Sequence, residues 1–157
     1  MDITVYTDGA CSGNPGVGGY AAILQCNGLE RVVKGFSSKV TTNCAMELAA
    51  VVETIKWLND KQKKPCNVTV HTDSQYLIDC ICGKNKDGSK RKVEWYTGRP
   101  NEDLWIELIK NVHKGKHTIK MVKVKGHSGD SMNARVDKLA KEECIRAKHE
   151  LLKERMK

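Results

Sequence analysis

Four acidic residues occupy positions in the sequence at which carboxylates could bind a metal ion. Asp8 follows an alternating apolar segment at the start of the chain, and Asp73 follows a second one; both segments predict strands. Because ligands of open α/β sheets bind beyond the carboxyl ends of the strands, we expect the two side chains at one edge of a sheet. Glu47 and Asp137 each stand beside an apolar residue of a predicted helix, at the border of its buried face.

Each of these carboxylates also has an ordinary structural explanation. Aspartate is common in the turns that follow strands, and acids in the first turn of a helix interact favourably with its dipole. Four carboxylates at one sheet edge, however, would repel one another unless cations neutralised them. Ligands that are all oxygen select hard ions such as Mg²⁺ or Mn²⁺. The sequence therefore predicts a site for a hard divalent cation.

The charge of the chain favours a polyanionic partner. Lysine and arginine number 27 against 19 acidic residues, which gives a formal net charge of +8 and a pI near 9.1. Such an excess attracts nucleic acid through steering and counterion release. The 157 residues predict one domain. With no apolar run of the roughly 20 residues that a membrane span needs and no signal-peptide pattern, we expect a cytoplasmic protein without membrane contact.

The cysteines do not indicate a disulfide framework or a zinc site. There are seven, an odd number, and no two of them have the spacing of a CxxC pair. We interpret most of them as small buried apolar residues in a reducing compartment.

The order of predicted elements indicates an α/β fold with a mixed sheet. Antiparallel hairpins come first, with Asn27-Gly28 as a hairpin turn, and βα crossovers follow. The last helix has a highly charged end that can fray. The predicted strands are 3–8, 18–25, 30–40, 68–73 and 119–125; the predicted helices are 44–58, 74–82, 104–112 and 136–151, with a basic loop at 84–92 and a turn at 126–130.

Five segments in chain order resemble the type 1 ribonuclease H family. They are YTDGACSGNPG (6–16), TTNCAMEL (41–48), HTDSQY (71–76), GHSG (126–129) and NARVDKLA (133–140). The resemblance covers residues 1–145, taken as a single catalytic domain, and leaves 146–157 as a charged helical extension. It implies an RNase H-like fold: a five-stranded mixed sheet, with three antiparallel strands followed by parallel βα units, flanked by helices. It also implies endonucleolytic cleavage of RNA paired to DNA.

The resemblance assigns a role to each acidic residue in a site with two Mg²⁺ ions, for which Mn²⁺ can substitute. Asp8 would bridge both ions, Glu47 and Asp73 would complete the site at the leaving oxygen, and Asp137 would hold the ion that activates water. The expected products carry 5′-phosphate and 3′-hydroxyl ends. His127, in a turn flanked by glycines, matches a histidine that assists proton movement or product release.

The family also implies contacts with an RNA/DNA hybrid. Asn43 and Gln75 match residues that read the minor groove, where the 2′-hydroxyl distinguishes RNA, and the backbone amide near Cys11 can contribute. Asn14 and Thr42 match positions near the substrate backbone, with Thr42 at a DNA phosphate. Helix capping is a competing role for Thr42 and Asn43.

A basic handle on the DNA strand is the last feature implied. We assign it to Lys90, Arg91, Lys92 and Trp95, because basic side chains interleaved with aromatics favour nucleic-acid contact over a merely solvated loop. The sequence departs from the family here, with Ile81-Cys82-Gly83 where an aromatic residue often stands. Trp57 and Trp105 lie in helical stripes and are interpreted as core.

Two alternatives share this fold. A catalytically silent module that binds hybrids is opposed by the presence of all four acids. A junction resolvase or an integrase fits poorly with the His127 turn and the glycine that follows Asp8. A monomer is the simplest expected state.

Overall fold

Five strands form one mixed sheet in the order β3-β2-β1-β4-β5. β1 (Asp2–Cys11), β2 (Gly16–Cys26) and β3 (Leu29–Thr41) are antiparallel neighbours, whereas β4 (Asn67–Thr72) and β5 (Thr118–Lys123) add to β1 in parallel. The computed structural model describes residues 1–124 and 131–157. It confirms the predicted fold class, and the predicted turn at 126–130 lies outside the described residues.

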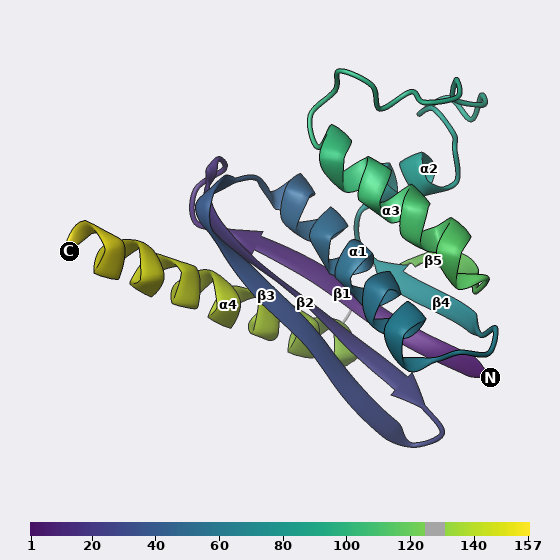
Figure 1. The fold of residues 1–157 in the computed structure, drawn as a ribbon, viewed down its shortest axis with the longest axis horizontal. Coiled ribbons are helices and arrows are strands. Elements are labelled where there is room, and N and C mark those ends of the chain that lie inside the picture. Colours follow the sequence, from purple (N-terminus) through teal and green to yellow (C-terminus); the bar gives the residue numbers. More distant parts are fainter. Residues whose placement is uncertain (125–130) are drawn as a thin grey trace.

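Helices cover both faces of the sheet (Figure 1). α1 (Asn43–Lys61), α2 (Gln75–Ile81) and α3 (Glu102–Gly115) lie on one face, and α4 (Ser131–Arg155) crosses the other over β1, β2 and β3. The main core lies under α1, whose Leu48, Val51 and Ile55 are almost fully buried against the sheet. On the far face, Val136 and Ala140 of α4 pack on β2. This burial of apolar surface on two faces fixes both helices that carry predicted acidic ligands.

The hairpin between β2 and β3 confirms the turn prediction. Asn27 and Gly28 both have positive φ angles, 49° and 78°. Two residues of positive φ define the type I′ turn, which suits the twist of antiparallel strands. Cys26 and Leu29 close the ladder on either side of it.

The prediction that the first strand ends at Asp8 was wrong. β1 continues through Gly9 to Cys11 and stays paired with β2 as far as Gly18. Gly9 makes this possible because a Cβ there would stand 2.6 Å from the backbone nitrogen of Glu47. Only a residue without a side chain lets the strand pass so near the start of α1.

α4 is longer than the apolar pattern indicated. It runs unbroken from Ser131 to Arg155, and its last turns extend beyond the edge of the sheet (Figure 1). In the part of the chain that the structure describes, no helix is both long and apolar enough to span a membrane.

Candidate active site

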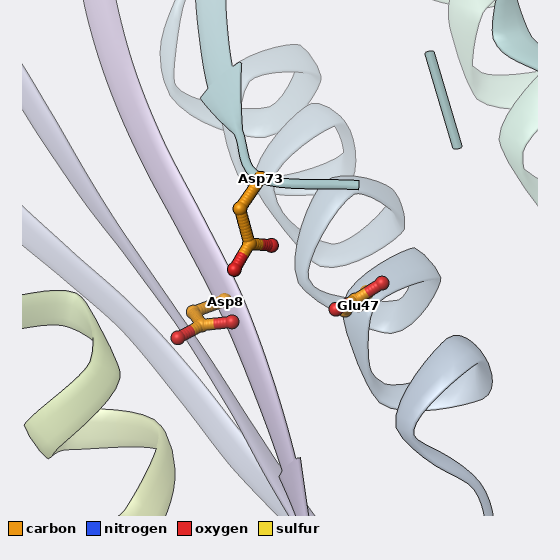
Figure 2. Close-up of side chains that lie close together, drawn as sticks. All are labelled: Asp8, Glu47 and Asp73. Carbon is orange, nitrogen blue, oxygen red and sulfur yellow. The ribbon is translucent and has the colours of Figure 1, made fainter. Parts of the chain in front are cut away.

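Three of the predicted acidic residues meet at the centre of the sheet. Asp8, Glu47 and Asp73 each offer one carboxylate oxygen, and these oxygens all lie within 4.8 Å of one another. Figure 2 shows Asp8 on β1, with the carboxylate of Asp73 pointing toward it and Glu47 approaching from α1. Residues 8, 47 and 73 thus come together from a strand, a helix and a strand end.

The register of the parallel strands places the two aspartates level with each other. Tyr6 of β1 pairs with His71 of β4, so the residues two positions further on, Asp8 and Asp73, stand side by side. β4 ends at Thr72, and Asp73 therefore projects from the carboxyl end of its strand, as predicted. Asp8 is 9% exposed, whereas Asp73 is exposed to solvent.

Glu47 is positioned by the start of α1. Thr42 is the N-cap, and its hydroxyl accepts a hydrogen bond of 3.1 Å from the Ala45 backbone N–H. This confirms the capping role predicted for Thr42. The close approach of Gly9 to the Glu47 backbone then brings the half-buried carboxylate toward Asp8.

The cluster is electrostatically strained without a cation. Burial, followed by repulsion from Asp73, raises the pKa of Asp8 to about 8, although the Gly9 backbone N–H donates a 2.9 Å hydrogen bond to its carboxylate. Burial, and again Asp73, raises the pKa of Glu47 to about 7, opposed by a hydrogen bond with Ser74. Both carboxyl groups are therefore partly protonated at neutral pH, and a bound cation would favour their ionised forms.

Asp137 lies on the other side of Asp8. It hydrogen-bonds with Asp8 and repels it, two further causes of the raised pKa of Asp8. The Lys141 ammonium pairs with Asp137 at 2.9 Å, one helical turn along α4. Nearby, the guanidinium of Arg135 donates two hydrogen bonds, of 2.8 and 2.9 Å, to Glu30 at the β2–β3 hairpin and lowers the pKa of that carboxyl to about 2. This pair joins the turn of α4 that carries Asp137 to the β2–β3 hairpin.

The donor set fits a hard divalent cation. All of the converging atoms are carboxylate oxygens, the ligands that Mg²⁺ and Mn²⁺ prefer. Burial and then mutual repulsion raise the pKa values of Asp8 and Glu47. Among the described residues, Lys141 is the cation beside Asp8, and it is paired with Asp137. Asp8, Glu47 and Asp73 could hold one ion, and Asp8 with Asp137 could hold a second.

Several predicted substrate residues surround the amino end of α1. The Asn14 side-chain oxygen accepts a hydrogen bond of 3.3 Å from the Asn43 backbone N–H, which joins the β1–β2 turn to the helix. Cys11 is half-buried, and its thiol donates to the carbonyl oxygens of Gly16 and Thr41. Asn14 and Asn43 themselves are exposed, so both remain available to a ligand.

Gln75 opens α2, two residues after Asp73. It is exposed, and its amide donates a 2.8 Å hydrogen bond to Asp79. The preceding residue, Ser74, caps α2 by accepting from the Leu77 N–H and also hydrogen-bonds with Glu47. Ser74 thus connects Glu47 with the start of α2, a contact that the sequence prediction missed.

The basic loop after α2 is anchored by Arg91. Its guanidinium carbon lies 6.0 Å from the Tyr76 ring centroid, and its Nε donates a 2.6 Å hydrogen bond to the Lys84 carbonyl. Lys90 and Lys92 are exposed, whereas Trp95 is half-buried against the core. Trp105 is 2% exposed, which confirms its interpretation as core.

Two further residues, His127 and Lys141, differ in how far the sequence indicated them. His127, which was predicted, lies outside the described residues. Lys141 was not predicted, although its position four residues after Asp137 is the spacing at which helical side chains of opposite charge pair.

Comparison with known proteins identifies the family of this chain. The chain matches the family described as RNase H over residues 1–145. It is 44% identical over 144 residues to Ribonuclease H of Caldicellulosiruptor saccharolyticus, covering 89% of this chain and 94% of that one. It is 43% identical over 150 residues to Ribonuclease H of Nitratidesulfovibrio vulgaris, covering 93% and 91%.

Solved structures with the same fold are RNase H1 enzymes. LC11-RNase H1, crystallised in complex with an RNA/DNA hybrid, superposes with a TM-score of 0.73 at 21% identity, covering 92% of this chain and 98% of that one. RNase H1 of Halobacterium salinarum gives 0.70 at 19% identity, covering 93% and 99%. These likenesses define the fold class. The sequence relatives and the family match show more: the chain belongs to the RNase H family and is a ribonuclease.

Proposed function

We propose that this chain is an endoribonuclease that hydrolyses the RNA strand of RNA/DNA hybrids with two divalent ions, Mg²⁺ in the first instance, leaving 5′-phosphate and 3′-hydroxyl ends. The observation that carries the proposal is the convergence of Asp8, Glu47 and Asp73 within 4.8 Å, with Asp137 on the other side of Asp8. The relatives named Ribonuclease H support the reaction, and the hybrid bound to LC11-RNase H1 supports the substrate.

The four carboxylates have distinct roles in this proposal. Asp8 would be a ligand of both ions, Glu47 and Asp73 would complete the ligands of the ion that neutralises the leaving oxygen, and Asp137 would complete those of the ion that activates water. When bound, the two ions supply an activated water and neutralise charge on the phosphate and the leaving oxygen. Lys141 keeps the Asp137 carboxylate oriented before the ions arrive, and His127 assists proton movement or product release.

Substrate recognition is proposed for the residues around the site. Asn43 and Gln75, with the backbone near Cys11, would read the minor groove and the 2′-hydroxyls that distinguish RNA from DNA. Asn14 and Thr42 would contact the backbone. Lys90 and Lys92 would bind phosphates of the DNA strand, on a loop whose shape depends on Arg91 and Trp95.

The test uses one end-labelled RNA, presented single-stranded, paired to RNA and paired to DNA. We expect cleavage of the hybrid alone in Mg²⁺, none with chelator, and 5′-phosphate on the downstream product. Hybrid binding without cleavage in either Mg²⁺ or Mn²⁺ would instead identify a silent binding module. Cleavage of a four-way junction in preference to the hybrid would identify a resolvase. Sedimentation of the free protein tests the proposed monomeric state.

A further inference from the structure

The edge of α4 that carries Asp137 continues as a row of cations. Residues Asp137, Lys141, Lys148 and Arg155 follow at intervals of four, seven and seven. At about 100° per residue, their directions around the helix axis agree to within about 40°. Since Asp137 and Lys141 face Asp8, Lys148 and Arg155 project from the same edge of the helix.

The two outer cations have no competing partner. Both are exposed, and among the described residues neither forms an ion pair or a side-chain hydrogen bond. Other cations of the same helix end are engaged: Arg146 pairs with Glu143 at 3.0 Å, and Lys153 with Glu150 at 3.4 Å. Lys148 and Arg155 therefore offer unneutralised positive charge along this edge.

The row of cations runs beside the β1–β2 turn, which we propose to contact the substrate. Cys144 of α4 donates its thiol to the Val17 carbonyl at 3.5 Å, so the helix runs alongside the β1–β2 turn with Asn14. In Figure 1 the end of α4 lies at the opposite side of the molecule from the basic loop that follows α2. The two basic elements thus flank the acidic cluster from different directions.

The distances suit a long polyanion rather than a single phosphate. With a rise of about 1.5 Å per residue, Lys148 lies about 16 Å and Arg155 about 27 Å along the helix from Asp137. One strand of a duplex carries a phosphate about every 3.4 Å, so these correspond to about five and eight phosphates. Both Lys148 and Arg155 lie beyond residue 145, where the family match ends.

We propose that Lys148 and Arg155 form a second contact with the hybrid backbone, on the side of the site away from the basic loop, and so lengthen the footprint on the substrate. This inference rests on the proposed function. It predicts a length dependence, because a short hybrid centred on the acidic cluster cannot reach the row and a long one can. If only residues 1–145 touched the hybrid, replacing Lys148 and Arg155 would not weaken binding at either length.

The experiment measures hybrid binding by fluorescence anisotropy with chelator present, using duplexes of about 8 and about 24 base pairs. We expect the double variant Lys148→Ala/Arg155→Ala to bind the long hybrid roughly 3- to 10-fold more weakly. The slope of the logarithm of the binding constant against the logarithm of the salt concentration should become shallower by about 1.4–1.8. Each phosphate that the protein no longer neutralises accounts for about 0.7–0.9 of this slope. Binding of the short hybrid should not change. The control Lys153→Ala, on a different face and already paired with Glu150, should match the wild type on both.

Equal binding of the long hybrid by the double variant and the wild type would overturn the proposal. Ile145 and Leu152, 49% and 53% exposed, flank the row, so the same edge could instead bind protein. A wild-type dimer in sedimentation that Leu152→Ser dissociates, together with unchanged hybrid binding, would establish that alternative. Cleavage of the short hybrid by the wild type tests the proposed function separately, because the row does not contribute to it.

Discussion

The guanidinium carbon of Arg91 lies 4.5 Å from the centroid of the Trp95 ring, and Trp95 in turn packs edge to face with Trp105 at 5.0 Å. Arg91 also donates its backbone N–H to the Gly83 carbonyl. A cation in the middle of the basic loop is thus held down onto the core. We therefore expect Arg91 to act mainly by fixing the loop, and the exposed Lys90 and Lys92 to reach phosphates.

Arg91→Lys should therefore not preserve function. Lysine keeps the charge but lacks the planar group that stacks on Trp95 and the Nε–H that reaches the Lys84 carbonyl. We expect hybrid binding to weaken roughly 3- to 10-fold, about as much as in Arg91→Ala, with kcat little changed. Anisotropy titration measures this, and Lys92→Arg is the matched control. A lysine variant that binds like the wild type would show that Arg91 acts only through its charge.

Asp8→Asn should abolish turnover and stabilise the metal-free protein. Because the proposed function makes Asp8 a ligand of both ions, its loss should lower kcat by about 10³-fold or more. The folded pKa of Asp8, about 8, is raised above its unfolded value, so the ionised carboxylate destabilises the fold as pH rises from about 4 to about 8. The amide avoids this cost, which reaches several kcal/mol once the carboxylate is fully ionised at alkaline pH.

Thermal melts of both proteins with chelator measure this effect. The variant should melt higher than the wild type at about pH 9, and the gap should narrow toward about pH 5, where the buried carboxyl is protonated. Asp60→Asn, at an exposed acid of α1, is the control and should show no such trend. A difference in melting temperature between Asp8→Asn and the wild type that does not change with pH would contradict the cause given for the raised pKa of Asp8.

Metal binding should release protons and strengthen with pH. Burial holds the pKa of Asp8 near 8 and that of Glu47 near 7, and both must ionise to bind a cation. Mg²⁺ affinity should rise between about pH 6 and about pH 8 and level off above. Calorimetry in buffers of different ionisation enthalpy counts the protons, which should approach two per site at about pH 6 and vanish above about pH 9. A Mg²⁺ affinity that does not change with pH would contradict the assignment of Asp8 and Glu47 as metal ligands.

Gly9→Ala should damage the site more than the fold. The new Cβ would stand 2.6 Å from the Glu47 nitrogen and 2.8 Å from Met46 Cβ, so β1 and α1 must separate. We expect a loss of about 1–3 kcal/mol in the free energy of unfolding. We also expect kcat to fall under conditions in which the variant is still fully folded, because Glu47 is displaced from Asp8. Gly28→Ala is the control: its φ of 78° makes alanine strained, but nothing lies within 4 Å. Equal kcat in the two variants would argue against a positioning role for Gly9.

What could be predicted from the sequence depended on local interactions. The Asn27-Gly28 turn and the Thr42 cap involve atoms a few residues apart, and both are confirmed. The mixed sheet followed from the order of elements. The grouping of Asp8, Glu47 and Asp73 was predicted from strand ends and helix borders, although Asp8 proved to lie within its strand.

The features that were missed depend on contacts between distant segments. The continuation of β1 through Gly9 is a response to the backbone of α1, almost forty residues away in the sequence. The stacking of Arg91 on Trp95 requires Trp105 behind it. Ser74 reaches Glu47 only because the fold brings the start of α2 beside α1. Periodicity and turn chemistry carry no information on such pairs.

The central position of β1 determines the order in which the active site is lost during unfolding. β1 is hydrogen-bonded on one side to β2 and on the other to β4, so its amides can exchange with solvent only when the sheet itself opens. α4 is held to the sheet by side chains and can detach in a smaller opening. Partial unfolding would therefore remove Asp137 first and leave Asp8, Glu47 and Asp73 in place, so the ion shared by those three should outlast the other as denaturant is added.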